Sequence, residues 1–182
     1  SPTWFYQNLM MKVALKERIF YQVIIPDISA CFYFDIDASE LGFPMNDFIQ
    51  AVFEEMAKEQ SILNVEELWR TTVLLDALCN VKGVPKKSST HGICHGLIFS
   101  DNHTSMKAFA IRIKTRLENR PDAARFRVMK KGELVIPFDL AVYSRHQNFR
   151  FYGNSKLEPL DDERRPLIIS PYNRFEGMPN TD

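Results

Sequence analysis

Three aspartates interrupt otherwise apolar segments of the sequence. Asp35 and Asp37 lie in the run ACFYFDIDAS, and Asp139 lies in VIPFDLAVY. Side chains alternate between the two faces of a strand, so Asp35 and Asp37 share one face while Ile36 takes the other. A carboxylate in an apolar strand is costly unless it is paired, hydrogen-bonded or metal-bound. The run therefore predicts either a metal site or, as the alternative, a strand end that emerges into solvent.

Asp139 repeats this situation, because its neighbours along the strand are apolar and it takes the opposite face. Three carboxylates on core strands suit Mg²⁺ or Mn²⁺, which prefer oxygen ligands. In a two-metal site, one ion activates an attacking hydroxyl and the other neutralises charge on the leaving pyrophosphate. The candidate catalytic and metal-ligating residues are therefore Asp35, Asp37 and Asp139, and the leading chemistry is nucleotidyl or phosphoryl transfer.

The segment SRHQNFRFYGNSK, which follows Asp139, interleaves cations with aromatic residues. Its cations Arg145, Arg150 and Lys156 could bind a triphosphate, since Arg offers a planar fork to phosphate oxygens and Lys a compact charge. The alternative is a solvated edge strand.

The segment SSTHGICHGLIFS carries two histidines, His91 and His95, with Ser89 close by. A histidine can donate to phosphate when it is protonated or suitably hydrogen-bonded, although a structural role is the alternative for each. The candidate nucleotide-binding residues are His91, His95, Arg150 and Lys156, whereas Ser88 and Ser89 are by default loop residues.

Composition limits the class of protein. A chain of 182 residues with 45% hydrophobic and 25% charged residues is expected to form one globular domain. A net charge of zero excludes a protein that coats nucleic acid with a strongly basic surface. Three cysteines without metal-type CxxC spacing favour a reduced, intracellular protein without a zinc ribbon. No segment approaches the roughly 20 apolar residues of a membrane span, so a membrane is not an expected partner.

Hydrophobic periodicity predicts an α+β domain whose strands pair largely antiparallel, with helices covering one face. We expect a loop over 80–92, a connection over 118–126 and an extended tail beyond Leu157. Helices are expected near 4–15, 45–60 and 104–117, and strands near 18–26, 30–39, 71–78, 93–100, 133–144 and 148–156.

These segments together resemble the catalytic core of the eukaryotic PrimPol family, in the archaeo-eukaryotic primase superfamily, from about Thr3 to Leu157. FYQVIIPDISACFYFDIDAS is similar to motif I, KKSSTHGICHGLIF to motif II and FDLAVYSRHQNFRFYGNSKL to motif III. The resemblance implies an RRM-like, mainly antiparallel sheet covered by helices. It also implies a primase-polymerase catalytic core over 1–157 and a C-terminal extension or linker over 158–182.

The resemblance makes Asp35, Asp37 and Asp139 the ligands of Mg²⁺ or Mn²⁺. It assigns the motif II histidine to His95, because GLIF follows it, and the motif II serine to Ser89. The close S-x-H spacing of the family occurs instead at Ser89 and His91. Arg150 and Lys156 fall where the family binds the incoming nucleotide, and Gln147 stands where a further Arg is expected.

The implied function is template-directed nucleotidyl transfer by a DNA primase-polymerase that makes or extends primers, including at stalled or damaged replication sites. Its implied partners are template DNA, primer and nucleoside triphosphates, with single-strand-binding or replication proteins as further candidates, in the mitochondrion, the nucleus or both. The alternative is a catalytically weak primase-like protein that acts as an assembly or interaction factor. The spacing of motif II and the presence of Gln147 motivate that alternative.

Overall fold

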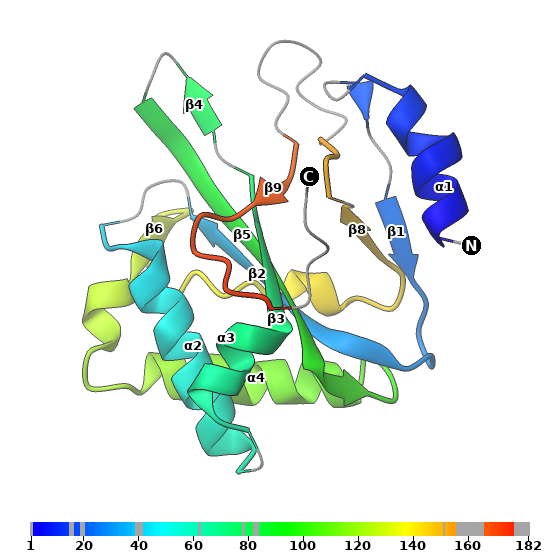
Figure 1. Cartoon of the computed structure of the whole chain (residues 1–182). Coiled ribbons are helices and arrows are strands. Elements are labelled where there is room, and N and C mark those ends of the chain that lie inside the picture. The colour runs from blue at the N-terminus through cyan, green and yellow to red at the C-terminus, as the bar shows by residue number, and fades with distance from the viewer. Residues whose placement is uncertain are drawn as a thin grey trace.

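The computed structural model describes residues 2–14, 17–18, 21–38, 42–61, 63–77, 79–81, 84–150, 152–155 and 166–176. Within these ranges helices and strands pack together, and all paired strands run antiparallel (Figure 1). The prediction of an α+β fold with mainly antiparallel pairing is therefore confirmed. No helix in the described ranges has the length and apolar character needed to cross a membrane.

The central sheet has the strand order β2-β5-β3-β9. Its strands are β2 (Ala30–Ala38), β5 (Val84–Phe99), β3 (Thr72–Asp76) and β9 (Ile168–Ile169), with β4 (Cys79–Val81) paired to the N-terminal part of β5. On β2 the alternation is as predicted, since Phe32, Phe34 and Ile36 are completely buried. These side chains form one face of the core.

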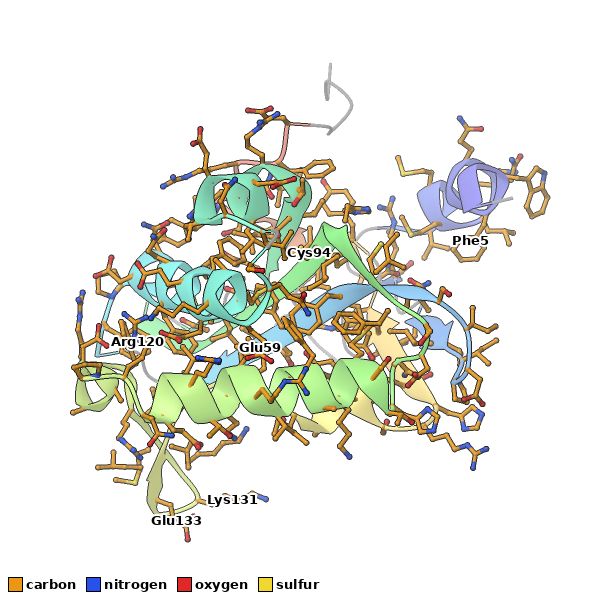
Figure 2. The ribbon with its side chains drawn as sticks, turned by 90° about the horizontal axis from the view of Figure 1, so that it is seen from below. Phe5, Glu59, Cys94, Arg120, Lys131 and Glu133 are labelled. Atoms are coloured by element: carbon orange, nitrogen blue, oxygen red, sulfur yellow. The ribbon has the colours of Figure 1, made fainter. Side chains whose placement is uncertain are left out.

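Helices α2 (Met45–Glu59) and α4 (Ser105–Glu118) cover that face of the sheet. The ring of Phe109 on α4, for example, meets that of Phe32 edge-on at 5.1 Å between centroids. Both helices were predicted from their apolar spacing. Ion pairs also join α2 to this region: Glu59 pairs with Arg116 of α4, and Glu55 pairs with Arg120, just after α4. Figure 2 labels Glu59 and Arg120.

A second, two-stranded sheet lies over the opposite face of the central sheet. It consists of β1 (Tyr21–Ile24) and β8 (Gln147–Arg150). The ring of Phe149 on β8 lies 4.9 Å from that of Tyr33 on β2 and 4.7 Å from that of His91 on β5. The two sheets therefore face each other over the surface that carries the candidate residues.

The remaining elements are short. They comprise α1 (Pro2–Asn8), the 3-10 helices η1 (Met10–Lys12), η3 (Ala123–Phe126) and η4 (Ala141–Tyr143), α3 (Val65–Thr71), and the hairpin strands β6 (Val128–Lys130) and β7 (Glu133–Val135). The expected helix over 4–15 is therefore split into α1 and η1. The structure also contains α3, which was not predicted, and η3 in the expected connection.

The predicted loop over 80–92 is wrong, because β4 and β5 occupy most of it. Two of its polar residues bond to neighbouring strands of the sheet. The hydroxyl of Ser89 donates to Asp35 and that of Thr90 to Asp76. Gly92 is needed for a different reason: an added Cβ there would lie 2.1 Å from the Phe34 ring. These serine and glycine residues thus serve side-chain bonding and close packing rather than a turn.

The strand predicted over 133–144 is too long. β7 ends at Val135, and one isolated bridge then joins Ile36 to Phe138. Pro137 has no backbone N–H to donate, and the Asp139 carboxylate accepts from the backbone of Ala141, where η4 begins. The strand predicted over 148–156 is likewise shortened to β8, and Gly153 follows it with a φ of 73°.

Part of the expected C-terminal tail belongs to the fold. Ile168 and Ile169 form β9, and Leu167 is completely buried against β3. The backbone of Ser170 also donates to the carbonyl oxygen of Leu74. Ile168 and Ile169 therefore extend the sheet, and their neighbours pack against β3.

Candidate functional site

Asp35 and Asp37 lie on the face of β2 that points away from α2 and α4. Their neighbours Phe34 and Ile36 are fully buried on the helix side, so strand alternation directs the two carboxylates toward the smaller sheet. Both aspartates are partly exposed, and the Asp35 side chain retains 17% of its accessible surface. The pair thus lies at the border between the core and solvent.

The backbone places Asp139 directly opposite Asp35. Its N–H donates to the carbonyl oxygen of Asp35 at 2.9 Å, and the N–H of Asp37 donates to that of Pro137 at 3.1 Å. These bonds flank the Ile36–Phe138 bridge, whose side chains enter the core. Asp35 and Asp139 are therefore cross-strand neighbours on the other face, with Cα atoms about 5.5 Å apart by the geometry of antiparallel pairing.

The Asp139 carboxylate has two contacts of its own. Its Oδ1 accepts from the backbone N–H of Ala141 at 2.9 Å, and its Oδ2 lies 3.6 Å from Nζ of Lys130 on β6. Three neighbouring carboxylates have the donor chemistry that fits a hard divalent cation. With these side-chain positions, however, the described residues contain no group of three or more His, Cys, Asp or Glu arranged to hold a metal.

His91 and Ser89 come from β5, next to the carboxylates of β2. The register pairs Asp35 with His91 and Asp37 with Ser89. Nε2 of His91 lies 3.5 Å from Oδ1 of Asp35, and the Ser89 hydroxyl donates to the same oxygen at 3.3 Å. His91 is buried beneath the Phe149 ring. One cross-strand row therefore runs His91, Asp35, Asp139.

Arg150 brings a buried cation to this row from β8. Burial lowers the pKa of its guanidinium, while the charges of Tyr21, Asp35 and Asp37 oppose that shift. A cavity of about 160 Å³ opens here, lined by Asp35, His91, Arg150 and Gln147 together with Tyr21, Val142, Asn148 and Phe149. Gln147 accepts from the Ser144 hydroxyl at 2.7 Å. The cavity thus combines a carboxylate, an imidazole and a guanidinium.

Two tyrosines connect η4 to β2 behind the acidic residues. The hydroxyl of Tyr143 donates to the carbonyl oxygen of Tyr33 at 2.5 Å, and that of Tyr33 donates to the carbonyl oxygen of Val142 at 2.9 Å. Burial, followed by the charges of Tyr33, Asp35 and Asp139, raises the pKa of Tyr143 well above 10. Its hydroxyl therefore remains a donor that holds the Asp139 segment against β2.

His95 lies elsewhere on β5. It is four residues beyond His91, about 13 Å along an extended strand. Its ring is 5.4 Å from that of Phe175, and its Nδ1 is 4.0 Å from Sγ of Cys31. It lines a separate, mainly apolar groove of about 410 Å³. The structure therefore brings Ser89, His91 and Arg150 to the acidic row but not His95.

The candidate Lys156 lies outside the described residues. Ser88, the neighbour of Ser89 on β5, pairs with Ala38 at the next register position. Sequence reasoning missed Tyr21, Tyr143 and Lys130 as neighbours of the site. Only Tyr143 carried a usable signal, since it lies four residues after Asp139 in a segment already singled out.

No protein-family model matches this chain, and no curated protein matches it. A proposal of its function therefore depends on its sequence motifs and on the chemistry and placement of its own residues.

Proposed function

We propose that this chain is a template-directed nucleotidyltransferase of the primase-polymerase type, which makes or extends primers from nucleoside triphosphates. The observation that supports it best is the row of His91, Asp35 and Asp139 beside the buried Arg150. Carboxylates and phosphate-binding cations occur together in metal-dependent nucleotidyl transfer. The resemblance of the three sequence motifs to the PrimPol family supports the same reaction.

Arg150 and His91 are suited to hold phosphate oxygens. A guanidinium donates charge-assisted hydrogen bonds, roughly twice as strong as neutral ones, and burial keeps water from competing for it. The cavity of about 160 Å³ is smaller than the 300–1,000 Å³ typical of pockets that enclose a whole ligand. It therefore fits the phosphate chain of a nucleotide rather than the whole molecule.

The placement of the two histidines favours His91 as the phosphate contact. It lines the same cavity as Arg150, whereas His95 lines the other groove. Ser89, two residues earlier on the same face of β5, gives the close S-x-H spacing of the family. The register of the sheet therefore supports His91 as the phosphate contact. The flanking GLIF in the sequence had favoured His95 instead.

Asp35, Asp37 and Asp139 are the residues that would hold Mg²⁺ or Mn²⁺. Such ions, when bound, would activate the primer hydroxyl and neutralise charge on the pyrophosphate. Ser89 and His91 hold Oδ1 of Asp35 from the β5 side, which orients that carboxylate. The Tyr33 and Tyr143 hydroxyls hold the Asp139 segment in register.

A second candidate function is an assembly or interaction factor with a primase-like fold. The contacts of Asp139 with Lys130 and Ala141 favour it, because they occupy a carboxylate that a metal would need. This candidate predicts a folded protein without metal-dependent synthesis.

A primer-extension assay distinguishes the two functions. A labelled primer-template is incubated with deoxynucleotides and Mn²⁺ or Mg²⁺, using the wild type, Asp35→Ala and the control Glu118→Ala. Glu118 is an exposed carboxylate at the end of α4. We expect synthesis by the wild type and Glu118→Ala, and a loss of at least roughly hundredfold in Asp35→Ala, as for removal of one group that stabilises transition-state charge.

Circular dichroism should show all three proteins folded. A folded wild type without metal-dependent synthesis would contradict the enzyme proposal and favour the interaction factor. Equal activity of Asp35→Ala and the wild type would contradict the assigned site.

A further inference from the structure

The β6–β7 hairpin borders the acidic site and projects from the molecule. At its base Val128 is buried opposite Val135, and on the same face Nζ of Lys130 lies 3.6 Å from Oδ2 of Asp139. Figure 2 shows Lys131 and Glu133 at its tip, pointing away from the helices. The hairpin is thus anchored in the core at one end and free to meet a partner at the other.

The outer face of the hairpin combines apolar and basic side chains. The register places Met129 opposite Leu134, and these side chains are 57% and 58% exposed. Arg127, in extended backbone two residues before Met129, and Lys131, in the turn two residues after it, are also exposed. The Arg127 guanidinium donates to the carbonyl oxygen of Leu134 at 3.1 Å, which ties the two strands together.

The turn at the tip places Lys131 in a left-handed backbone conformation, in which Gly, Asn or Asp would be less strained. Lys131 and Gly132 have φ values of 54° and 87°, as in a type I′ turn. Both central positions of that turn favour Gly, Asn or Asp, because other side chains clash in the left-handed region. Lys131 therefore occupies this position at a cost to the turn, which suggests a use for its charge.

We propose that the outer face of this hairpin binds the nucleic-acid duplex beside the acidic site, an inference that rests on the proposed function. The outer cations are Arg127 and Lys131, since Lys130 points to Asp139 on the other face. Residues 127–134 contain one carboxylate, Glu133, although the whole chain has no net charge. Cations at this edge complement the phosphate backbone.

The shape of the hairpin also suits a duplex. A groove of a duplex admits a two-stranded ribbon, and exposed apolar side chains can wedge against base steps. Met129 and Leu134 supply such a wedge between the two outer cations. This arrangement assigns phosphate contacts to Arg127 and Lys131 and base or sugar contacts to the apolar pair.

Fluorescence anisotropy of a labelled primer-template duplex tests the inference, without metal or nucleotide so that binding is separate from catalysis. The full chain is compared with Lys131→Asn, Arg127→Ala and Met129→Ser. The matched controls are Lys107→Ala and Ile111→Ser, whose side chains are exposed on α4. Affinity is measured over a range of salt concentrations.

Each cation removed from the hairpin should reduce the slope of log affinity against log salt by about 0.9. Met129→Ser should weaken binding roughly tenfold with the slope unchanged, because it removes an apolar contact. Lys131→Asn is the sharpest variant, since asparagine suits the turn. The protein should remain at least as stable to denaturant while it loses a phosphate contact.

Duplex affinity and slope that are unchanged in all three hairpin variants would overturn the inference and point to a protein partner for this face. The inference would also be overturned if the wild type did not bind the duplex, or if the control variants weakened duplex binding as much as the hairpin variants do. Failure of the proposed function has a different signature, namely duplex binding that depends on the hairpin without any nucleotide addition.

Discussion

At the residue scale, the choice between two histidines decides where a nucleotide would bind. His91 and His95 are four residues apart on one strand, yet only His91 meets Asp35 and lines the cavity that contains Arg150. The difference arises from the segments that pack on β5, since Phe149 of β8 lies against His91 whereas Phe175, which follows β9, lies against His95.

His91→Ala should therefore raise the apparent Michaelis constant for the nucleotide, whereas His95→Ala should leave it unchanged. Loss of one hydrogen bond to a charged group is worth about 1.5–3 kcal/mol, or roughly ten- to hundredfold. Steady-state primer extension at fixed metal concentration measures both values. A larger increase of the Michaelis constant in His95→Ala than in His91→Ala would show that His95, not His91, contacts the phosphate.

Lys130 is a second residue whose role depends on a single contact. Its ammonium lies 3.6 Å from a carboxylate that we propose as a metal ligand, so it competes with a divalent cation for the same charge.

Lys130→Met retains most of the side-chain stem and removes the cation. We expect it to tighten Mn²⁺ binding roughly two- to fivefold, since the ion pair is partly exposed and such pairs are worth at most about 1 kcal/mol. Isothermal titration calorimetry without nucleotide measures the change, with Lys107→Met as the control. Unchanged or weaker Mn²⁺ binding would show that Lys130 does not compete with the metal ion for the Asp139 carboxylate.

At the element scale, β5 is the strand on which the site depends. It pairs with both β2 and β3, and its register sets Ser89 beside Asp37 and His91 beside Asp35. Gly92 allows this register because the Phe34 ring of β2 occupies the space where a Cβ would lie.

Gly92→Ala should accordingly destabilise the protein by about 1–3 kcal/mol, as expected when a methyl group is forced into a packed core. Gly42→Ala is the matched control, because no atom lies within 4 Å of its added Cβ. Urea unfolding monitored by circular dichroism gives both free energies. Equal stabilities of the two variants would show that Phe34 moves aside without cost.

At the scale of the whole molecule, the C-terminal segment is held to the sheet by a buried carboxylate. Asp76 accepts from the hydroxyl of Thr90 at 2.7 Å and from that of Ser170 at 2.8 Å. Burial raises the pKa of Asp76 above its ordinary value of 3.8, and the two hydroxyl bonds only partly oppose that shift. The Asp76 carboxyl therefore links β3 to Thr90 of β5 and to Ser170 of the C-terminal segment. Its raised pKa favours the neutral, protonated form of this carboxyl.

Stability should depend on pH through this carboxyl. Because its pKa is higher in the folded state, its contribution is fully present below the unfolded value near 3.8 and is lost as pH rises through the folded pKa. As pH rises through this range, the free energy of unfolding of the wild type should fall relative to that of Asp76→Asn. The fall should be about 1.4 kcal/mol for each pH unit that separates the folded pKa from the unfolded one.

Denaturant unfolding of both proteins between acidic and neutral pH measures this difference. Glu118→Gln, an exposed carboxylate, serves as the control and should show no such trend. A difference between the wild type and Asp76→Asn that does not vary with pH would show that Asp76 has the same proton affinity in both states.

The sequence by itself determined the features that depend on neighbouring residues. Alternation in ACFYFDIDAS placed Asp35 and Asp37 on one face, and apolar spacing located α2 and α4. These predictions succeed because strand and helix periods are set within a few residues of backbone. The apolar neighbours of Asp139 likewise marked it before its partners were known.

Only the tertiary structure decided which of these residues meet. The Ile36–Phe138 bridge places Asp139 opposite Asp35, the register of β5 selects His91, and the path of β6 carries Lys130 to Asp139. Serine and glycine in β5 looked like a loop because their bonds and close contacts come from other strands. Such pairings depend on burial and hydrogen bonds summed over distant segments, which local sequence patterns do not contain.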